Sequence, residues 1–195
     1  MKHRVGMFAV VMGLLVAGSV SAAEQYKIDP EHSAVEFSAP HLVISKVKGH
    51  FGKVAGTITY DESDVTKSSV EATIQTDSID TGVEGRDKHL RSPDFLDAAQ
   101  FPTITFKSAS VEKRGDGYVA KGPLTIRGVT KDVEMPFQVT GKAQDPWGNT
   151  HLGAEGAFAI NRQDYGVSWN KQLDNGGVLV GDEVKITLNI EGLKQ

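Results

Sequence analysis

The feature that most constrains the fold is an alternation of apolar and polar residues. Single residues, most of them polar, separate Val133, Met135, Phe137 and Val139. A period of two puts successive side chains on opposite faces of a β-strand, whereas a helix repeats about every 3.6 residues. Including this one, alternating runs lie at 35–37, 54–60, 70–75, 103–107, 124–127, 133–140, 152–158 and 183–190. The chain is therefore predicted to be all-β, with roughly eight antiparallel strands.

Turn-forming residues separate these runs. Residues 114–117 read Arg-Gly-Asp-Gly and predict a hairpin, Gly128 lies in a tight link between two runs, and residues 145–149 are dense in turn formers. A hairpin tip explains the Arg-Gly-Asp tripeptide better than a cell-adhesion motif does.

The alternation leaves two architectures open. Strands with one apolar face must bury that face, either in a two-sheet sandwich or in a closed barrel. The chain has no cysteine, so no disulfide stabilises either form, and closure has the advantage of removing exposed strand edges. An eight-stranded barrel is also close to the size at which the interior is either filled by side chains or holds one ligand.

Residues 83–97 break the β pattern and predict two short helices. Asp87 and Arg91 are spaced i,i+4, as in a stabilising pair on one helix face. Ser92 is a good N-cap and Pro93 suits the first position of a second helix. The apolar residues of this segment are expected to pack the two helices against an open end of the β structure.

The first 22 residues resemble a secretory signal peptide. Lys2 and Arg4 form a basic start, residues 7–17 are almost wholly apolar, and small residues precede the bond between Ala22 and Ala23. This order predicts cleavage between Ala22 and Ala23. The apolar stretch is well short of the roughly 20 residues that span a bilayer, so no stable membrane anchor is expected. Residues 1–22 are the predicted signal and residues 23–195 one domain.

The charge of the chain limits its partners. The formal net charge is −4, and loss of Lys2 and Arg4 with the signal peptide takes it to −6. A net negative charge argues against nucleic acid as a partner and against adhesion to anionic lipid surfaces.

The sequence shows no arrangement typical of an enzyme or a metal site. There is no G-x-S-x-G elbow, no H-E-x-x-H helix and no convincing glycine-rich phosphate loop. His32 and His41 are the histidines that could meet in space, but structural or surface roles are favoured for all six histidines. Core packing is the default expectation for Trp147 and Trp169, although both lie near loops and either suits a rim. The chain is predicted to have no catalytic residue and no metal ligand.

A resemblance to a known family emerges at residues 86–96, which read RDKHLRSPDFL. This run, together with residues 26–29, 101–102, 124–131 and 145–148, resembles the YceI-like family of periplasmic, lipocalin-like, polyisoprenoid-binding proteins. The resemblance covers essentially all of the chain after the predicted signal.

The resemblance implies an eight-stranded antiparallel lipocalin-like barrel with a short helical segment over one end. It also implies a periplasmic location and an apolar cavity that sequesters or carries a long-chain isoprenoid lipid, of the polyprenyl phosphate or quinone type. No cofactor is required, and a homodimer is compatible with the family. An alternative is a stress-response or quinone-linked redox protein in which the bound lipid is a cofactor or incidental.

Alternation and resemblance together predict the binding residues. The expected cavity lining shares the inner face of the strands: Phe37, Ile58, Ile74, Phe106, Ile126, Met135, Phe137, Phe158 and Ile186. Arg86, His89 and Arg91 are expected either to hold the capping helix in place or to contact a lipid head group, and the structural role is favoured.

Overall fold

The computed structural model describes residues 23–42, 44–173 and 177–195. The predicted signal peptide, including Ala22, lies outside this range, and Ala23 is the first described residue. The strands are β1 Glu24–Ile28, β2 Ala34–His41, β3 Ser45–Phe51, β4 Val54–Tyr60, β5 Ser69–Gln75, β6 Ile79–Asp80, β7 Thr103–Lys107, β8 Ser110–Arg114, β9 Gly117–Ile126, β10 Val129–Gln144, β11 Thr150–Asn161 and β12 Glu183–Lys194. The helices are α1 Glu84–Arg91 and the short 3₁₀ turns η1 Val65–Lys67, η2 Thr76–Ser78 and η3 Arg162–Tyr165.

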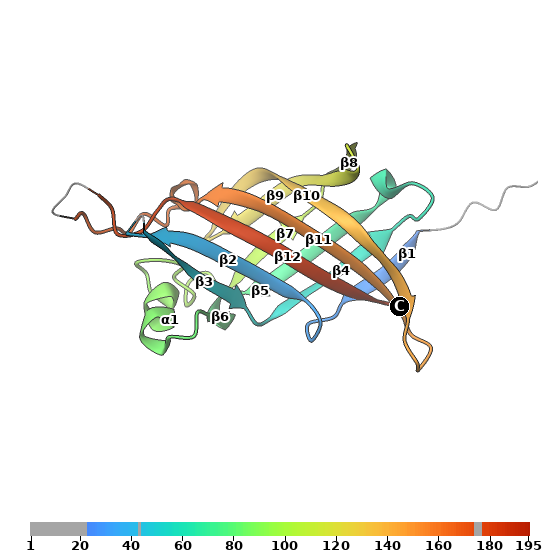
Figure 1. The fold of residues 1–195 in the computed structure, drawn as a ribbon, viewed down its shortest axis with the longest axis horizontal. Coiled ribbons are helices and arrows are strands. Elements are labelled where there is room, and N and C mark those ends of the chain that lie inside the picture. The colour runs from blue at the N-terminus through green and yellow to red at the C-terminus, as the bar shows by residue number, and fades with distance from the viewer. Residues whose placement is uncertain (1–22, 43, 174–176) are drawn as a thin grey trace, which may run out of the picture.

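The strands close into an elongated antiparallel barrel (Figure 1). Its closed path of eight strands runs β1-β4-β5-β7-β9-β10-β11-β12 and returns to β1. The closing pair is antiparallel and places Tyr26 opposite Lys194. The barrel prediction is thereby confirmed, and the sandwich alternative is excluded.

The remaining strands prolong members of this path, so the eight predicted strands are present although several are interrupted. Strand β2 continues β1 along the same edge of β12, β3 and β6 continue β4 and β5, and β8 continues β7 along β9. The break between β1 and β2 contains Pro30, which has no N–H to donate to a sheet. The short gaps let each long strand bend around the barrel without leaving it.

The helical segment is only partly as predicted. Helix α1 is present, but the second helix is wrong, because residues 92–97 form hydrogen-bonded turns instead. The amides of Phe95 and Asp97 both donate to the carbonyl of Ser92 at 3.0 Å. The Ser92 hydroxyl donates back to the carbonyl of His89 at 2.8 Å, and Asp97 takes a left-handed φ of 48° that ends the turn.

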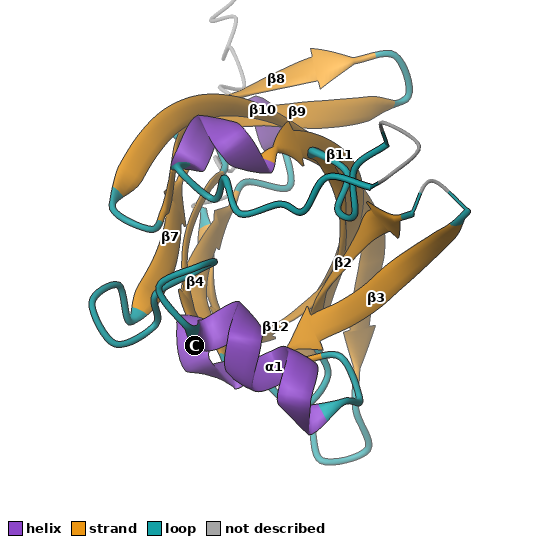
Figure 2. Cartoon of the chain, turned by 90° about the vertical axis from the view of Figure 1, so that its left-hand side faces the viewer, coloured by secondary structure: helices purple, strands orange, loops and turns teal. Residues whose placement is uncertain are grey.

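One end of the barrel is plugged by fully buried side chains. Tyr26 has 0 % of its surface exposed and Leu152 has 2 %. The Tyr26 and Tyr60 rings meet edge to face with centroids 6.5 Å apart. The Tyr26 hydroxyl donates to Glu24 at 2.6 Å, and burial, followed by this hydrogen bond, raises the pKa of Tyr26 to about 12. The opposite end, beside α1, faces the viewer in Figure 2. It also contains buried side chains such as Ile79 and Tyr165, each 2 % exposed, but His41, Arg86 and Trp169 there are only half-buried, so we call it the open end.

In the part of the chain that the structure describes, no helix is long and apolar enough to cross a membrane.

The plugged end and the middle of the barrel should respond differently to truncation. Leu152→Ala should destabilise the protein by about 2–5 kcal/mol, as expected for a filled core. Ile186→Ala should cost only about 1 kcal/mol, because Ile186 is half-buried and already faces a cavity. Urea unfolding of both variants measures the difference, and equal costs would mean that the middle of the barrel is packed solid.

Candidate functional site

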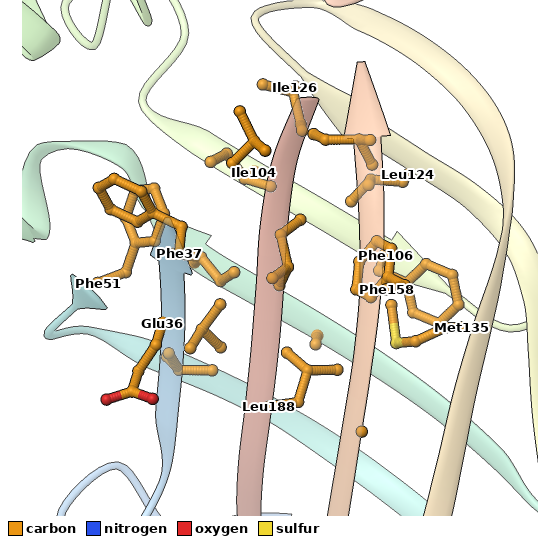
Figure 3. Close-up of a pocket in the computed structure, with 18 of the residues that line it drawn as sticks. Glu36, Phe37, Phe51, Ile104, Phe106, Leu124, Ile126, Met135, Phe158 and Leu188 are labelled. Carbon is orange, nitrogen blue, oxygen red and sulfur yellow. The ribbon is translucent and has the colours of Figure 1, made fainter. Parts of the chain in front are cut away.

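The barrel encloses a cavity of about 460 Å³ with a wall of aliphatic and aromatic side chains (Figure 3). Its volume lies in the range of small-molecule sites in proteins, roughly 300–1,000 Å³. The structure places all nine predicted side chains on the wall: Phe37, Ile58, Ile74, Phe106, Ile126, Met135, Phe137, Phe158 and Ile186. They come from strands all around the barrel, so the cavity is a product of closure and of no single element.

The wall is larger than predicted. Phe51, Ile104, Leu124 and Leu188 also line the cavity. Three of these lie two residues from a predicted lining residue on the same strand, so alternation alone contained the signal for them. Glu36 borders the same region, but its carboxylate points away from the apolar side chains in Figure 3.

The inner face lines a cavity because many of its side chains are not covered by others. Phe37, Ile58, Phe158 and Ile186 are all only half-buried, although their strands are central in the barrel. Gly49 contributes directly, because a Cβ there would lie 2.6 Å from Cζ of the Phe37 ring. The Phe37 ring therefore lies over the β3 backbone.

Helix α1 is fastened beside the open end by its arginines. Arg86 donates from Nε to the hydroxyl of Thr81 at 2.7 Å and from Nη2 to the Thr81 carbonyl at 2.9 Å. Arg91 donates from Nε to the carbonyl of Asp77 at 2.8 Å and from Nη2 to that of Ile79 at 2.7 Å. Both arginines thus hold the helix, but only Arg86 lines the cavity.

The predicted pairing of Asp87 with Arg91 is wrong. Asp87 is 6 % exposed and accepts from the amide of Thr81 at 2.9 Å and from its hydroxyl. The carboxylate therefore caps the strand-to-helix connection, while Arg91 bonds to main-chain carbonyls.

Three aromatic rings gather at the mouth of the cavity. His89 meets Phe95 and Trp169 edge to face, with centroids 4.9 Å apart in each case, and Phe95 lies 5.2 Å from Trp169. His89 and Trp169 line the cavity, so Trp169 serves as a rim aromatic. Trp147 is 84 % exposed at the plugged end, so the expectation of core packing is wrong for it, because its turn projects beyond the sheet.

Arg162 lies at the mouth, and no pattern in the sequence singles it out. It is 5 % exposed and lines the cavity. Its guanidinium makes five hydrogen bonds, to the carbonyls of Gly181, Val167, Trp169 and Val180 and to the Asp182 carboxylate. Since a guanidinium has five N–H donors, none remains for a ligand. Burial lowers the pKa of Arg162, and the residue acts as a clamp that ties two loop segments together.

Replacing the clamp should loosen the mouth. Arg162→Lys has at most three donors on one atom, so at least two of the five acceptors lose their hydrogen bond to residue 162. Hydrogen–deuterium exchange should accelerate at residues 167–169 and 179–182 and stay unchanged in β10 and β11. Unaltered exchange in both loop segments would show that they hold their positions without Arg162.

A second group of titratable side chains lies at the plugged end, outside the cavity. His32 bonds to Asp29 at 2.8 Å, and His151 bonds to Glu191 at 2.8 Å and to Asp145 at 3.2 Å. These hydrogen bonds to carboxylates raise the pKa of both histidines. Asp29, His32 and Glu191 are close enough together to hold a metal ion. However, Asp29 and His32 already bond to each other, and Glu191 bonds to His151.

The suggested meeting of His32 and His41 is wrong. His32 lies before β2 at the plugged end, whereas His41 ends β2, pairs with Val180 and lines the cavity mouth. The length of β2 therefore separates the two rings.

Residues 26–192 match the family model described as the YceI-like domain. Protein YceI from Salmonella newport (strain SL254) is 40 % identical over 197 residues, which cover 100 % of both proteins. The chain belongs to the YceI-like family. The family resemblance of residues 86–96 is thus confirmed by a match that extends over nearly the whole described chain.

Two solved structures share the fold of this chain. Burkholderia cenocepacia BcnA has a TM-score of 0.74 at 24 % identity, over 84 % of this chain and 98 % of its own. A polyisoprenoid binding domain from Saccharophagus degradans, implicated in plant cell wall breakdown, has a TM-score of 0.64 at 14 % identity, over 87 % of this chain and 98 % of its own. At these identities the similarity concerns the fold, and it confirms the lipocalin-like barrel.

Proposed function

We propose that this YceI-like protein is a non-enzymatic binding protein that sequesters or carries a long-chain isoprenoid lipid inside its barrel. The observation that carries the proposal is the apolar cavity of about 460 Å³, which Tyr26 and Leu152 close at one end and which has the half-buried Arg86, His89 and Trp169 on its wall beside α1. The shared fold with a domain that binds polyisoprenoids supports it. An apolar cavity inside an elongated barrel suits a linear hydrocarbon better than a polar metabolite.

The energetics favour such a cargo. An isoprene unit has about five carbons, and burying it is worth roughly 3–4 kcal/mol gross at about 0.8 kcal/mol per CH₂. Ordering the chain and the loss of its free motion oppose binding. A carrier needs to recover only part of the gross gain, because the same chain is nearly insoluble in water.

The titratable groups of the wall favour binding over catalysis. Tyr60 and Tyr165 have raised pKa values and Arg162 a lowered one, and burial is the main cause for all three. All five Arg162 donors are engaged by the protein itself. At a catalytic site a specific charge partner is expected in addition to burial, whereas the shifts of Tyr60 and Tyr165 come mainly from burial.

The proposed place of action is the periplasm. The basic and apolar start of the chain, with small residues before Ala23, supports export and cleavage. In the aqueous space between two membranes a long isoprenoid needs shielding, and the barrel offers it.

Arg86 favours an anionic head group. Its Nε and Nη2 are bonded to Thr81, whereas its Nη1 makes no hydrogen bond within the described part of the chain. The side chain lines the cavity and lies on the helix beside the mouth. A free guanidinium N–H at this place suits a phosphate oxygen, so a polyprenyl phosphate is favoured over a quinone.

A charge on the cavity wall should expel the lipid. Phe137→Glu places a carboxylate among apolar side chains, whereas Gln138→Glu places it on the exposed outer face of the same strand. Mass spectrometry of organic extracts should find isoprenoid lipid with the natively purified wild type and Gln138→Glu, and none with Phe137→Glu. Circular dichroism confirms folding of each variant, and lipid that co-purifies equally with folded Phe137→Glu would contradict the proposed cavity site.

The head-group assignment has a matched control on the same helix. Arg86→Gln should weaken binding of a polyprenyl phosphate by about tenfold, the usual worth of one charge-assisted hydrogen bond. Arg91→Gln loses similar carbonyl contacts but does not line the cavity, so its affinity should stay near wild type. Equal losses in both variants would mean that the arginines act only by holding α1.

A further inference from the structure

The open end of the barrel carries a projecting surface made of two chain segments. We call it the tip and define it as residues 41–42, 44–48, 171–173 and 177–180. The amide of Leu42 donates to the carbonyl of Leu179 at 3.0 Å, and His41 pairs with Val180. The amide of Leu179 in turn donates to Lys171 at 3.0 Å. The β2–β3 turn and the late loop therefore form one unit, seen at the left of Figure 1.

Large apolar side chains at the tip are exposed to solvent. Ile44 is 85 % exposed and Val178 is 42 % exposed. Of the four large apolar residues that are exposed in the described chain, only Trp147 lies at the plugged end, in the turn between β10 and β11. Val83, the fourth, precedes α1 beside the open end. The exposed apolar side chains thus gather at the end where the cavity opens.

The tip is also basic within an acidic protein. Lys46, Lys48 and Lys171 are all exposed, and the described tip residues include no acidic side chain. Asp174 follows in the sequence, so residues 41–48 and 171–180 carry three positive charges and one negative, a sum of +2. The whole chain has a net charge of −4. The net charge of the whole chain disfavours anionic lipid surfaces, but this sum does not reflect the local positive charge of the tip.

The tip is continuous with the cavity. His41, Leu179 and Val180 belong to the tip and also line the cavity wall. A hydrocarbon chain that leaves a bilayer at the tip would therefore pass from the membrane to the cavity wall without crossing bulk water.

We propose that the tip docks on the surface of an anionic lipid bilayer, with Ile44 and Val178 entering the head-group region and the lysines contacting lipid phosphates. The inference rests on the proposed lipid-carrier function, since it names the place where the carrier would load or release its cargo. Apolar side chains that enter the interface combined with basic residues around them are the usual elements of reversible membrane attachment.

Vesicle sedimentation tests the docking. The wild type should co-sediment with phosphatidylcholine vesicles that contain about one third phosphatidylglycerol. Vesicles of pure phosphatidylcholine should bind much less protein. Ile44→Ser should weaken binding by about tenfold, as for loss of one inserted aliphatic side chain. Lys46→Gln and Lys48→Gln should each weaken vesicle binding by about fivefold, and added salt should also weaken it.

Trp147→Ser is the matched control, since it removes an equally exposed apolar side chain at the other end of the barrel. It should bind vesicles like the wild type. If it loses as much binding as Ile44→Ser, or if Ile44→Ser binds normally, the docking proposal is overturned. Analytical ultracentrifugation tests whether a second copy of the chain occupies the tip instead. If the wild type is a dimer, and Ile44→Ser dissociates the dimer but leaves vesicle binding unchanged, the tip is a self-association surface and the proposal is overturned.

A fluorescent farnesyl-chain probe separates docking from cargo binding. The probe is short enough to reach the cavity from solution, so Ile44→Ser should bind it like the wild type. Wild-type protein that binds the probe but not the vesicles would overturn the docking and leave the carrier function standing. Wild-type protein that binds vesicles but not the probe would instead count against the carrier function.

Discussion

Pairing of the first strand with the last is the interaction on which the rest of this structure depends. Tyr26 to Ile28 pair with Gly192 to Lys194, and these bonds turn an open sheet into a barrel. Gly192 permits the contact, because a Cβ there would lie 2.9 Å from Cβ of Tyr26. A chain without cysteine has no covalent link to hold such ends together. Closure therefore relies on main-chain hydrogen bonds and on the buried Tyr26 side chain, and it removes the edges at which sheets aggregate.

Closure and the plug together explain why the interior is a binding cavity. A barrel of eight strands has room for either a packed core or a ligand. Bulky residues such as Tyr26, Tyr60 and Leu152 fill one end. Along the rest of the wall, side chains such as Phe37, Phe158 and Ile186 are only half-buried. The loops beside α1 are fastened at their backbones by Arg162 and by the arginines of α1. The mouth is thus held by polar contacts at its rim, which leaves the apolar wall free for a hydrocarbon.

The sequence was sufficient where a repeating pattern carried the information. Alternation predicted the strands and the inward face, because a register error would move every side chain to the wrong side. It missed β3, where Gly49 interrupts the inward face between Val47 and Phe51, and glycine and lysine have low strand propensity. The capping preferences of Ser92 and Pro93, and not the alternation, predicted a second helix after Ser92. There the Ser92 hydroxyl bonds backward to His89, an alternative that the local sequence pattern does not reveal.

Arg162 shows why the mouth was harder to predict than the wall. Four of its five partners are main-chain carbonyls, and carbonyls leave no signature in a sequence. The exposed Ile44 likewise follows from the β2–β3 turn, which no periodicity describes. Wall residues are selected by a repeated geometry, whereas mouth residues are selected by single loop conformations.

The opposition between local and overall charge has a physical consequence for a lipid carrier. Each lysine near an anionic membrane contributes about 1 kcal/mol of attraction, and this decays within about a Debye length. The three tip lysines are therefore felt only when the tip faces the membrane, while the acidic remainder of the chain repels other orientations. Such an arrangement orients the cavity mouth toward the bilayer without fixing the protein there. A carrier requires both properties, because a protein that adheres strongly cannot leave with its cargo.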